Sequence, residues 1–397
     1  MSRYTLSLIG ILLLLLVTAV TAQTMPESIT EAIQSELERS GVPSLQVAVG
    51  RGRELLFDGA FGFADVENDV PATTETKYRS SSISKWFTAT GAMLLAEQGR
   101  LDLDASIQKY CLQFPDKRWP ITTRQLLTHT SGIRHYADYE SELSQATTDD
   151  ERVSIRQRRS RDALGVFTRY TDVIAPLDNF KDDPLVFEPG TGWLYSSFGY
   201  RLLGCVLEGA SGREYQSFLT DEILVPAGMK STVPDDAWAI IPHRAAGYRL
   251  DKGASLRRAD MRDVSENLSA GGHLTTASDL IAFAQAFQAQ QLISAESAAQ
   301  MMHDLSSNSE EPEDYSSWRH AIPSRDKYGY GIMSFPNESG LWIGHTGRQA
   351  GSSSIVVLIP DEDLSLAVLT NVKGWGGYLS LVRKLHSIIQ QHAKPQN

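Results

Sequence analysis

Cysteine is nearly absent from this 397-residue sequence, which contains only Cys111 and Cys205. Two cysteines are too few for a fold that depends on a disulfide framework. Both have apolar neighbours, so they are either a disulfide pair formed in an oxidising compartment or two buried free thiols. The sequence leaves these two alternatives open.

Long apolar runs are also missing. The main one, residues 6–20, is shorter than the about 20 residues that a membrane-spanning helix needs. It follows Arg3 and ends in small residues up to Ala22, which is the order of a secretory signal peptide. We therefore expect residues 1–22 to be a cleaved signal peptide. The protein would then be exported, either periplasmic or secreted, with no stable membrane insertion after cleavage; an uncleaved anchor is the alternative.

Positive charge is in the minority, with 37 Lys and Arg against 48 Asp and Glu and a net charge of −11. An acidic chain is not expected to bind nucleic acid or an anionic membrane as its main partner. His129 and His135 have no carboxylate or cysteine partner at zinc-like spacing, and we interpret His129 as a structural part of a turn. The glycines at 271–272 and 329–331 lack the full dinucleotide fingerprint, which predicts backbone turns. We therefore expect neither a metal nor a cofactor.

Strand-like patterns lie near both chain ends. Hydrophobic residues make up 42% of the chain and charged residues 21%, which is typical of a globular protein. Amphipathic helices are expected over 27–39 and 379–390, and the middle of the chain has mostly helical patterns. Short β-branched or aromatic runs bounded by Gly, Pro and Asp indicate the strands. The expected strands are residues 44–50, 54–61, 341–345, 354–359 and 364–369.

This order of elements predicts an α+β fold. One antiparallel sheet would be built from both chain ends and flanked by helices, with a mainly helical subdomain inserted in the middle. The sheet subdomain would comprise residues 23–77 and 325–397, and the helical subdomain residues 78–324. Together they would form one large domain, which a chain of this length can build around a sizeable core.

Ser82 and Lys85 are three residues apart at the start of a helix expected over 82–98. That spacing places both side chains on one helix face, with Cβ atoms roughly 5–6 Å apart, so that the lysine can take the seryl proton. The same spacing occurs at Ser106 and Ser324, but only Ser82 opens a long apolar-periodic segment. A simple helix cap is the alternative role for Ser82.

Two downstream triplets add to this pair. The first is Tyr195-Ser196-Ser197, and the second is His345-Thr346-Gly347, placed where a strand is expected to end. A tyrosine can act as a base if cationic neighbours favour its phenolate. Taken alone, Tyr195 would be a core aromatic residue and His345 a structural histidine. Their order relative to Ser82 matches the S-x-x-K, polar-triplet and K-T-G set of β-lactamases and penicillin-binding proteins.

The chain resembles the class C β-lactamase-related serine hydrolases, and within them the animal mitochondrial serine β-lactamase-like group. The matching segments are FADVEN at 63–68, SSISK at 81–85, LLTHTSGIRHY at 126–136, YSSFGY at 195–200 and HTG at 345–347. The resemblance covers about residues 27–390 and implies a β-lactamase/transpeptidase-like fold with the site between its two subdomains. It also implies Ser82 as nucleophile, Lys85 and Tyr195 as acid/base partners, and an oxyanion hole from the backbone N–H groups of Ser82 and Arg348.

Two positions depart from that family. Ser197 stands where the β-lactamases have Asn, and His345 stands where they have Lys, so an amide and a permanent cation for a drug carboxylate are missing. Thr346 and Gly347 keep the rest of the substrate-binding triplet, and Arg348 either restores a cation or points to solvent. His345 would titrate near its ordinary pKa of about 6.5 and give activity a limb there. These departures argue against efficient β-lactam hydrolysis.

The sequence therefore predicts a serine hydrolase that forms an acyl-enzyme on a peptide or small-molecule substrate, as a peptidase, amidase or esterase. The sequence contains no G-x-S-x-G motif, which counts against the α/β-hydrolase fold as the alternative serine-enzyme scaffold. One alternative is a penicillin-recognising DD-peptidase or weak β-lactamase. Another is a non-catalytic protein that assembles into filaments, and a homo-oligomer is possible in either case.

Overall fold

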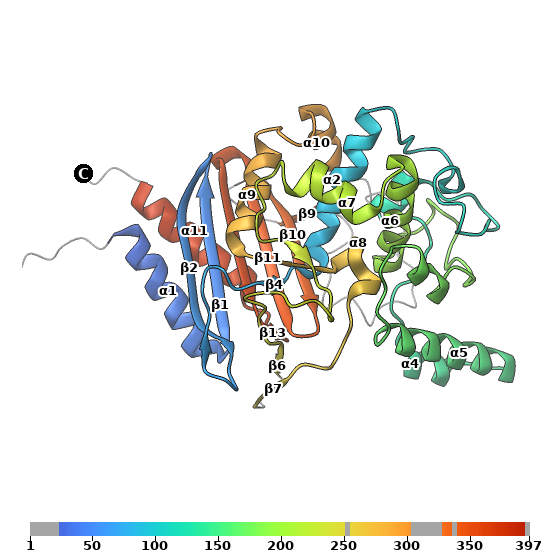
Figure 1. Ribbon diagram of the computed structural model, residues 1–397, viewed down its shortest axis with the longest axis horizontal. Coiled ribbons are helices and arrows are strands. Elements are labelled where there is room, and N and C mark those ends of the chain that lie inside the picture. Colours follow the sequence, from blue (N-terminus) through green and yellow to red (C-terminus); the bar gives the residue numbers. More distant parts are fainter. Residues whose placement is uncertain (1–23, 251–254, 303–327, 336–339, 394–397) are drawn as a thin grey trace, which may run out of the picture.

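The computed structural model describes residues 24–250, 255–302, 328–335 and 340–393. At its centre is a seven-stranded antiparallel sheet in the order β3-β2-β1-β12-β11-β10-β9 (Figure 1). The predicted signal peptide and Ser324 lie outside the described residues. The strands are β1 (Ser44–Arg51), β2 (Glu54–Asp65), β3 (Val70–Pro71), β9 (Met333–Phe335), β10 (Trp342–Gln349), β11 (Ser352–Ile359) and β12 (Leu364–Thr370).

Both chain ends contribute to this sheet, as predicted. β1 from the N-terminal end pairs with β12 from the C-terminal end, with Val47 opposite Val368. Strands β11 and β12 are buried along their whole length, which explains their nearly continuous runs of apolar residues. The sheet core is therefore closed by contacts between segments about 300 residues apart.

Helices cover both faces of the sheet (Figure 1). Helices α1 (Met25–Ser40) and α11 (Tyr378–Ala393) pack together on one face, where Val47 and Val49 of β1 join their core. Helix α9 (Ala277–Gln288) packs on the other face, against Ala48. Successive residues of a strand point to opposite faces, so β1 serves both cores.

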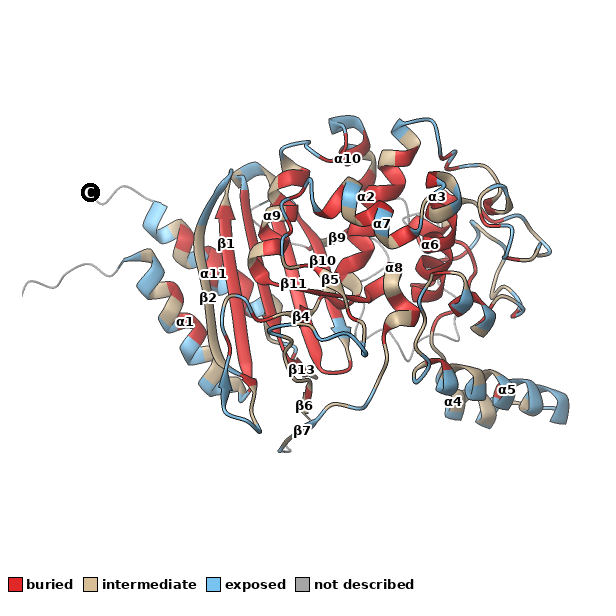
Figure 2. Ribbon diagram, viewed as in Figure 1, coloured by how far each residue is buried: buried red, intermediate tan, exposed pale blue. Residues whose placement is uncertain are grey.

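The rest of the inserted segment is mainly helical. Helices α2 and α6 are buried along most of their length, whereas the α4–α5 hairpin projects from the body and is largely exposed (Figure 2). Helix α9 packs on the sheet although it lies within residues 78–324, the range predicted for the helical subdomain. The bounds of the two subdomains remain a prediction. The other helices are α2 (Ser84–Glu97), α3 (Thr123–Leu127), α4 (Tyr139–Gln145), α5 (Asp149–Gly165), α6 (Ser197–Ser211), α7 (Tyr215–Leu219), α8 (Leu268–Gly271) and α10 (Ala295–Met302). Two small sheets contain β4 (Tyr78–Arg79), β5 (Val233–Pro234), β6 (Tyr248–Leu250), β7 (Leu256–Arg258), β8 (His273–Thr275) and β13 (Val372–Lys373).

The boundaries of two elements that carry predicted site residues differ from the sequence prediction in ways that matter for the site. The helix expected from residue 82 begins as a 3₁₀ helix, Ser81–Ile83, and becomes α-helical only at Ser84, because Ser81 enters it with a positive φ of 52°. Strand β10 does not end at His345. It pairs with β11 as far as Gln349, so the whole His345-Thr346-Gly347 triplet lies inside a strand.

The two cysteines form a disulfide. Cys111 and Cys205 have Cα atoms 5.5 Å apart, and the bond ties the segment after the 3₁₀ helix Ile107–Lys109 to the middle of α6. Both residues are buried. This decides between the two alternatives that the sequence left open, because only the fold brings the two segments together.

We expect the double variant Cys111→Ala, Cys205→Ala to have a free energy of unfolding lower by about 2–4 kcal/mol. The bond closes a loop of 94 residues, and a long loop gains much chain entropy when the crosslink is lost. Denaturant unfolding of the oxidised protein and the variant measures the difference. Reductant should lower the Tm of the wild-type protein but not of the variant, and an unchanged wild-type Tm would contradict the prediction.

Candidate active site

Ser82 lies where β10 passes close to the start of α2. It is the middle residue of the 3₁₀ helix Ser81–Ile83, which contacts β10 and β11. A Cβ atom at Gly347 would lie 2.3 Å from the carbonyl oxygen of Ser80, so only glycine permits this approach. The predicted Gly347 therefore acts through its small size, by bringing the backbone around Arg348 next to Ser82.

A cavity of about 650 Å³ opens over Ser82. It gathers most of the predicted site residues from β10, α6 and the 3₁₀ helix. Thr346 and Arg348, two residues apart on β10, both line it, as expected for one face of a strand. The predicted residues in its lining are Ser82, Tyr195, Ser197, Thr346 and Arg348.

Lys85 is fully buried beneath Ser82. Its Nζ atom donates to the Ser82 Oγ at 3.1 Å, to the Ser197 Oγ at 3.2 Å and to the carbonyl oxygen of Ala270 at 2.7 Å. An ammonium group would use its three donors on these three oxygens, whereas a neutral amine would donate to two of them and accept from the Ser82 hydroxyl; either way the contacts fix the direction of the Nζ atom. The seryl–lysine contact that the sequence predicted is present.

The surroundings of Lys85 favour its neutral form. Burial holds the pKa of the Lys85 amine well below its usual range, and the nearby positive charge of Arg201 lowers it further. A neutral amine has a lone pair, and the contact at 3.1 Å directs it toward the Ser82 hydroxyl. Lys85 is therefore suited to accept the seryl proton.

Tyr195 lies beside Ser82 in the cavity lining, and its ring centre is 5.0 Å from the Lys85 Nζ. Burial raises the pKa of the Tyr195 phenol above its usual value, and an interaction with the Ser82 side chain only partly offsets this. The condition for a phenolate base is not met, because burial disfavours the charged form of the phenol. Tyr195 is thus a neutral hydroxyl that can pass a proton.

Ser197, the first residue of α6, faces Lys85 rather than open space. Its hydroxyl accepts the hydrogen bond from Lys85, and its side chain is 7% exposed. In this position it helps to orient the lysine. The short hydroxyl is engaged, so it does not supply the amide that an acylamino substrate would meet.

His345 does not lie where the sequence predicted it would act. It is fully buried behind the cavity, where its Nε2 accepts from the Tyr328 hydroxyl at 3.1 Å and its Nδ1 donates to the carbonyl oxygen of Thr346. Burial, and then the charge of Lys85, lower the pKa of His345 to about 3. The expected limb near pH 6.5 from His345 is therefore wrong, because a ring between two fixed partners and out of water stays neutral there.

A buried ion pair beside the site was not predicted from the sequence. Arg201 pairs with Glu266 at 2.9 Å, its Nε donates to the Asn267 side chain at 2.8 Å, and it acts on the pKa of Lys85. A charged residue in the otherwise apolar run of α6 was the available clue. The Ala270 carbonyl gave no clue, since a backbone acceptor has no side-chain pattern.

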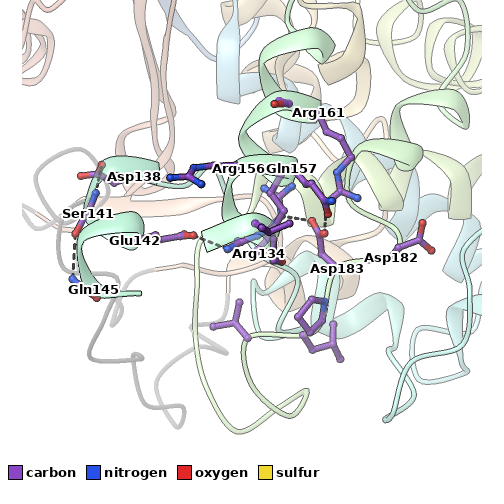
Figure 3. Close-up of a pocket in the computed structure, with 17 residues that line it drawn as sticks. Arg134, Asp138, Ser141, Glu142, Gln145, Arg156, Gln157, Arg161, Asp182 and Asp183 are labelled. Carbon is purple, nitrogen blue, oxygen red and sulfur yellow. Dashed lines mark hydrogen bonds and ion pairs between the residues drawn. The ribbon is translucent and has the colours of Figure 1, made fainter. Parts of the chain in front are cut away.

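A larger cavity, of about 1010 Å³, lies between α4, α5 and the segment 182–186. Figure 3 shows that some of its charged side chains are paired: Arg134 and Arg161 both bind the carboxylate of Asp183. It contains no serine with a lysine partner among the described contacts, so we do not consider it the reaction centre. Within the described residues, no cluster of His, Cys, Asp and Glu is arranged to hold a metal ion.

A family model described as Beta-lactamase matches residues 6–387. The chain belongs to the beta-lactamase family. The mitochondrial serine beta-lactamase-like protein LACTB of Mus musculus is 30% identical over 91% of this chain and 77% of that protein. Penicillin-binding protein 4* of Bacillus subtilis is 28% identical over 82% of this chain and 67% of its own length. The predicted resemblance is confirmed.

Solved structures confirm the predicted fold of this beta-lactamase family member. An octameric penicillin-binding protein homologue from Pyrococcus abyssi has a TM-score of 0.69 and 25% identity, covering 91% of this chain and 77% of that one. D-amino acid amidase from Ochrobactrum anthropi has a TM-score of 0.72 at 22% identity, covering 93% and 99%, which shows a shared fold. The family relationship supports a serine hydrolase.

The relatives leave the location of the protein open. They include mitochondrial animal proteins and a bacterial penicillin-binding protein, the latter compatible with export. None of the described helices is both long and apolar enough to cross a membrane. Export and the signal peptide remain predictions.

Proposed function

We propose that this protein is a serine hydrolase that forms an acyl-enzyme on Ser82 and acts as a peptidase, amidase or esterase. The observation that carries the proposal is the 3.1 Å contact of the Ser82 hydroxyl with Lys85, with Tyr195 beside them in the same cavity lining as a second proton-transfer partner. Such a pair of partners is what a weak seryl nucleophile needs for activation. No cofactor enters the scheme.

In this mechanism the Ser82 Oγ attacks the substrate carbonyl carbon while its proton passes to the neutral Lys85 amine. The carbonyl oxygen becomes an oxyanion facing the backbone N–H groups of Ser82 and Arg348, which we propose as its donors. When the carbon–heteroatom bond breaks, Tyr195 gives its proton to the leaving group and is reprotonated from Lys85. Water then adds to the acyl carbon and gives one proton to the same groups; the bond between that carbon and the Ser82 Oγ breaks, the Oγ takes the proton back, and the carboxylic acid is released.

The substrate side of the cavity favours simple amides or esters over β-lactams. Ser197 is occupied by Lys85, and His345 brings no charge, so neither replaces the Asn and Lys of β-lactamases. Losing one charged hydrogen bond costs about 1.5–3 kcal/mol, or roughly 10-fold and more in rate. The exposed apolar side chains of Phe167 and Met261 at the cavity mouth suit an apolar acyl group.

The experiment that tests the proposal is intact-mass analysis after exposure to a fluorophosphonate, followed by peptide mapping. One adduct on Ser82 is expected. Assays with activated esters, peptide anilides and a cephalosporin then rank the substrates. Cephalosporin turnover equal to that of the best ester would favour the alternative, a β-lactamase, and an unlabelled active protein would exclude a seryl nucleophile.

Charge on the substrate should also matter. Arg348 and Lys373 line the cavity, and neither side chain has a hydrogen bond or ion pair within the described part of the chain. Burial, and then the charge of Arg348, lower the pKa of Lys373, so the site repels added cations. Arg348→Ala should lower kcat/KM for a carboxylate-bearing ester by about 10-fold. The neutral ester of the same alcohol is the control, and an equal loss on both would contradict the prediction.

A further inference from the structure

The backbone of the Tyr195-Ser196-Ser197 triplet is held by two buried histidines. The Ser196 N–H donates to the Nδ1 atom of His129 at 3.1 Å, and the Ser197 N–H donates to the Nδ1 atom of His135 at the same distance. The His129 ring centre also lies 4.3 Å from that of Tyr195. One imidazole is thus fixed to each of two successive peptide groups.

These contacts belong to a longer pairing of two segments. The Leu194 N–H donates to the carbonyl oxygen of His129 at 2.9 Å, and the Ser196 hydroxyl donates to that of Arg134 at 2.6 Å. Residues 194–197 therefore run alongside residues 129–135 and hydrogen-bond with them. Because α6 begins at Ser197, the first N–H groups of that helix have no acceptor within the helix itself.

Two side chains of the triplet, those of Tyr195 and Ser197, reach the reacting atoms. The positions of both depend on this backbone. Tyr195 lies beside Ser82 in the cavity lining, and Ser197 accepts from Lys85 at 3.2 Å. A shift of the peptide at 196 or 197 would move both contacts together. A displacement of about 1 Å at reacting groups lowers rates by up to about 10²-fold.

Each histidine must be neutral to accept at Nδ1. An N–H donor faces each Nδ1 atom, so the ring proton is assigned to Nε2. Burial is the main cause that holds the pKa of both rings well below the usual range. For His129 the nearby Lys85, His345 and His135 add to it, and for His135 the charges of Lys85, Arg201, Arg134 and Arg262 do.

Packing alone does not explain His129. Its Nε2 atom is buried without a hydrogen-bond partner in the described part of the chain, and its backbone has a positive φ of 62°. A buried unpaired N–H group costs about 1–3 kcal/mol, so an apolar side chain would fill the same space at lower cost. The acceptor at Nδ1 is what an apolar residue cannot provide.

We infer that His129 and His135 are positioning residues, whose neutral Nδ1 atoms hold the triplet so that Tyr195 and Ser197 meet Ser82 and Lys85. The inference rests on the proposed function. Neither ring exchanges a proton with the substrate in this role. An acceptor oxygen in the place of Nδ1 should therefore preserve catalysis.

Two nearly isosteric replacements of His135 test this. Asn places its Oδ1 close to the former Nδ1, whereas Leu has the same size and no acceptor. We expect His135→Leu to lower kcat for p-nitrophenyl acetate, and the rate of Ser82 labelling by a fluorophosphonate, by about 10-fold or more with little change in KM. His135→Asn should stay within about 3-fold of the wild type.

Thermal unfolding of both variants shows whether each is folded at the assay temperature. Equal losses in the Asn and Leu variants would overturn the inference, because a proton-transferring ring cannot be replaced by an amide. His129→Asn is the second test, since Asn tolerates the positive φ and retains an acceptor. It should also stay within about 3-fold, and a larger loss in the folded variant would remove His129 from this role. Absence of labelling in the wild-type protein would instead be a failure of the proposed function.

Discussion

Ser82→Ala is expected to give no fluorophosphonate adduct and to lower kcat/KM for an activated ester by at least about 10³-fold. The hydroxyl of Ser82 contacts Lys85 and lies in the same cavity lining as Tyr195, and alanine leaves that space without a nucleophile. Intact-mass analysis and steady-state kinetics on the same preparation measure the two effects. The removed hydroxyl is small, so the fold should be retained.

Ser106→Ala is the matched control for this change. Ser106 precedes Lys109 with the same spacing, but its hydroxyl donates to Gln108, and the Lys109 Nζ lies 5.3 Å from the centre of the Tyr110 ring. This variant should be labelled and should turn over substrate like the wild type. An adduct that persists in Ser82→Ala would refute Ser82 as the nucleophile.

Replacing either proton-transfer partner should lower turnover by roughly 10²-fold or more. Tyr195→Phe removes only a hydroxyl. Lys85→Met retains most of the volume of the stem, which matters because Lys85 is fully buried. Both changes remove a proton acceptor or donor and leave Ser82 in place, so the labelling rate should fall along with kcat.

The pH profile separates the two partners. Since the pKa of Lys85 is lowered by burial, the amine is neutral above that value, and activity should be lost as the pH falls through it. This acidic limb should be absent from the residual activity of Lys85→Met and retained in Tyr195→Phe. Lys109→Met, which replaces a lysine outside the site in the same way, is the control. If all three site residues proved dispensable, a non-catalytic assembling role would replace the hydrolase.

Local spacing was enough to predict the central pair. Ser82 and Lys85 lie within one helical turn, so their contact follows from helix geometry once a helix is expected there. The sheet was also predictable, because strands buried on both faces require nearly continuous apolar runs near both chain ends. These features depend on residues that are close in sequence or on the burial of whole segments. Both can be inferred from composition and periodicity.

Other features required the tertiary structure. The direction of His345 depends on Tyr328 and on β10 continuing to Gln349, and the neutral state of Tyr195 depends on how deeply the fold buries it. Such effects arise between segments that are distant in sequence. Whether a pKa is raised or lowered depends on the distances to neighbouring groups and on the exclusion of water.

By itself, the sequence determined the seryl–lysine pair and the two-ended sheet, because each leaves a pattern of residue types at regular spacing, and it indicated the family through the resemblance of its motif segments. Only the tertiary structure decided that Cys111 and Cys205 are joined, that Arg201 acts on Lys85, and that His129 and His135 hold the tyrosine triplet. The physical reason is that a buried polar contact is specific in three dimensions: its acceptor can be a backbone carbonyl or a ring nitrogen from any part of the chain.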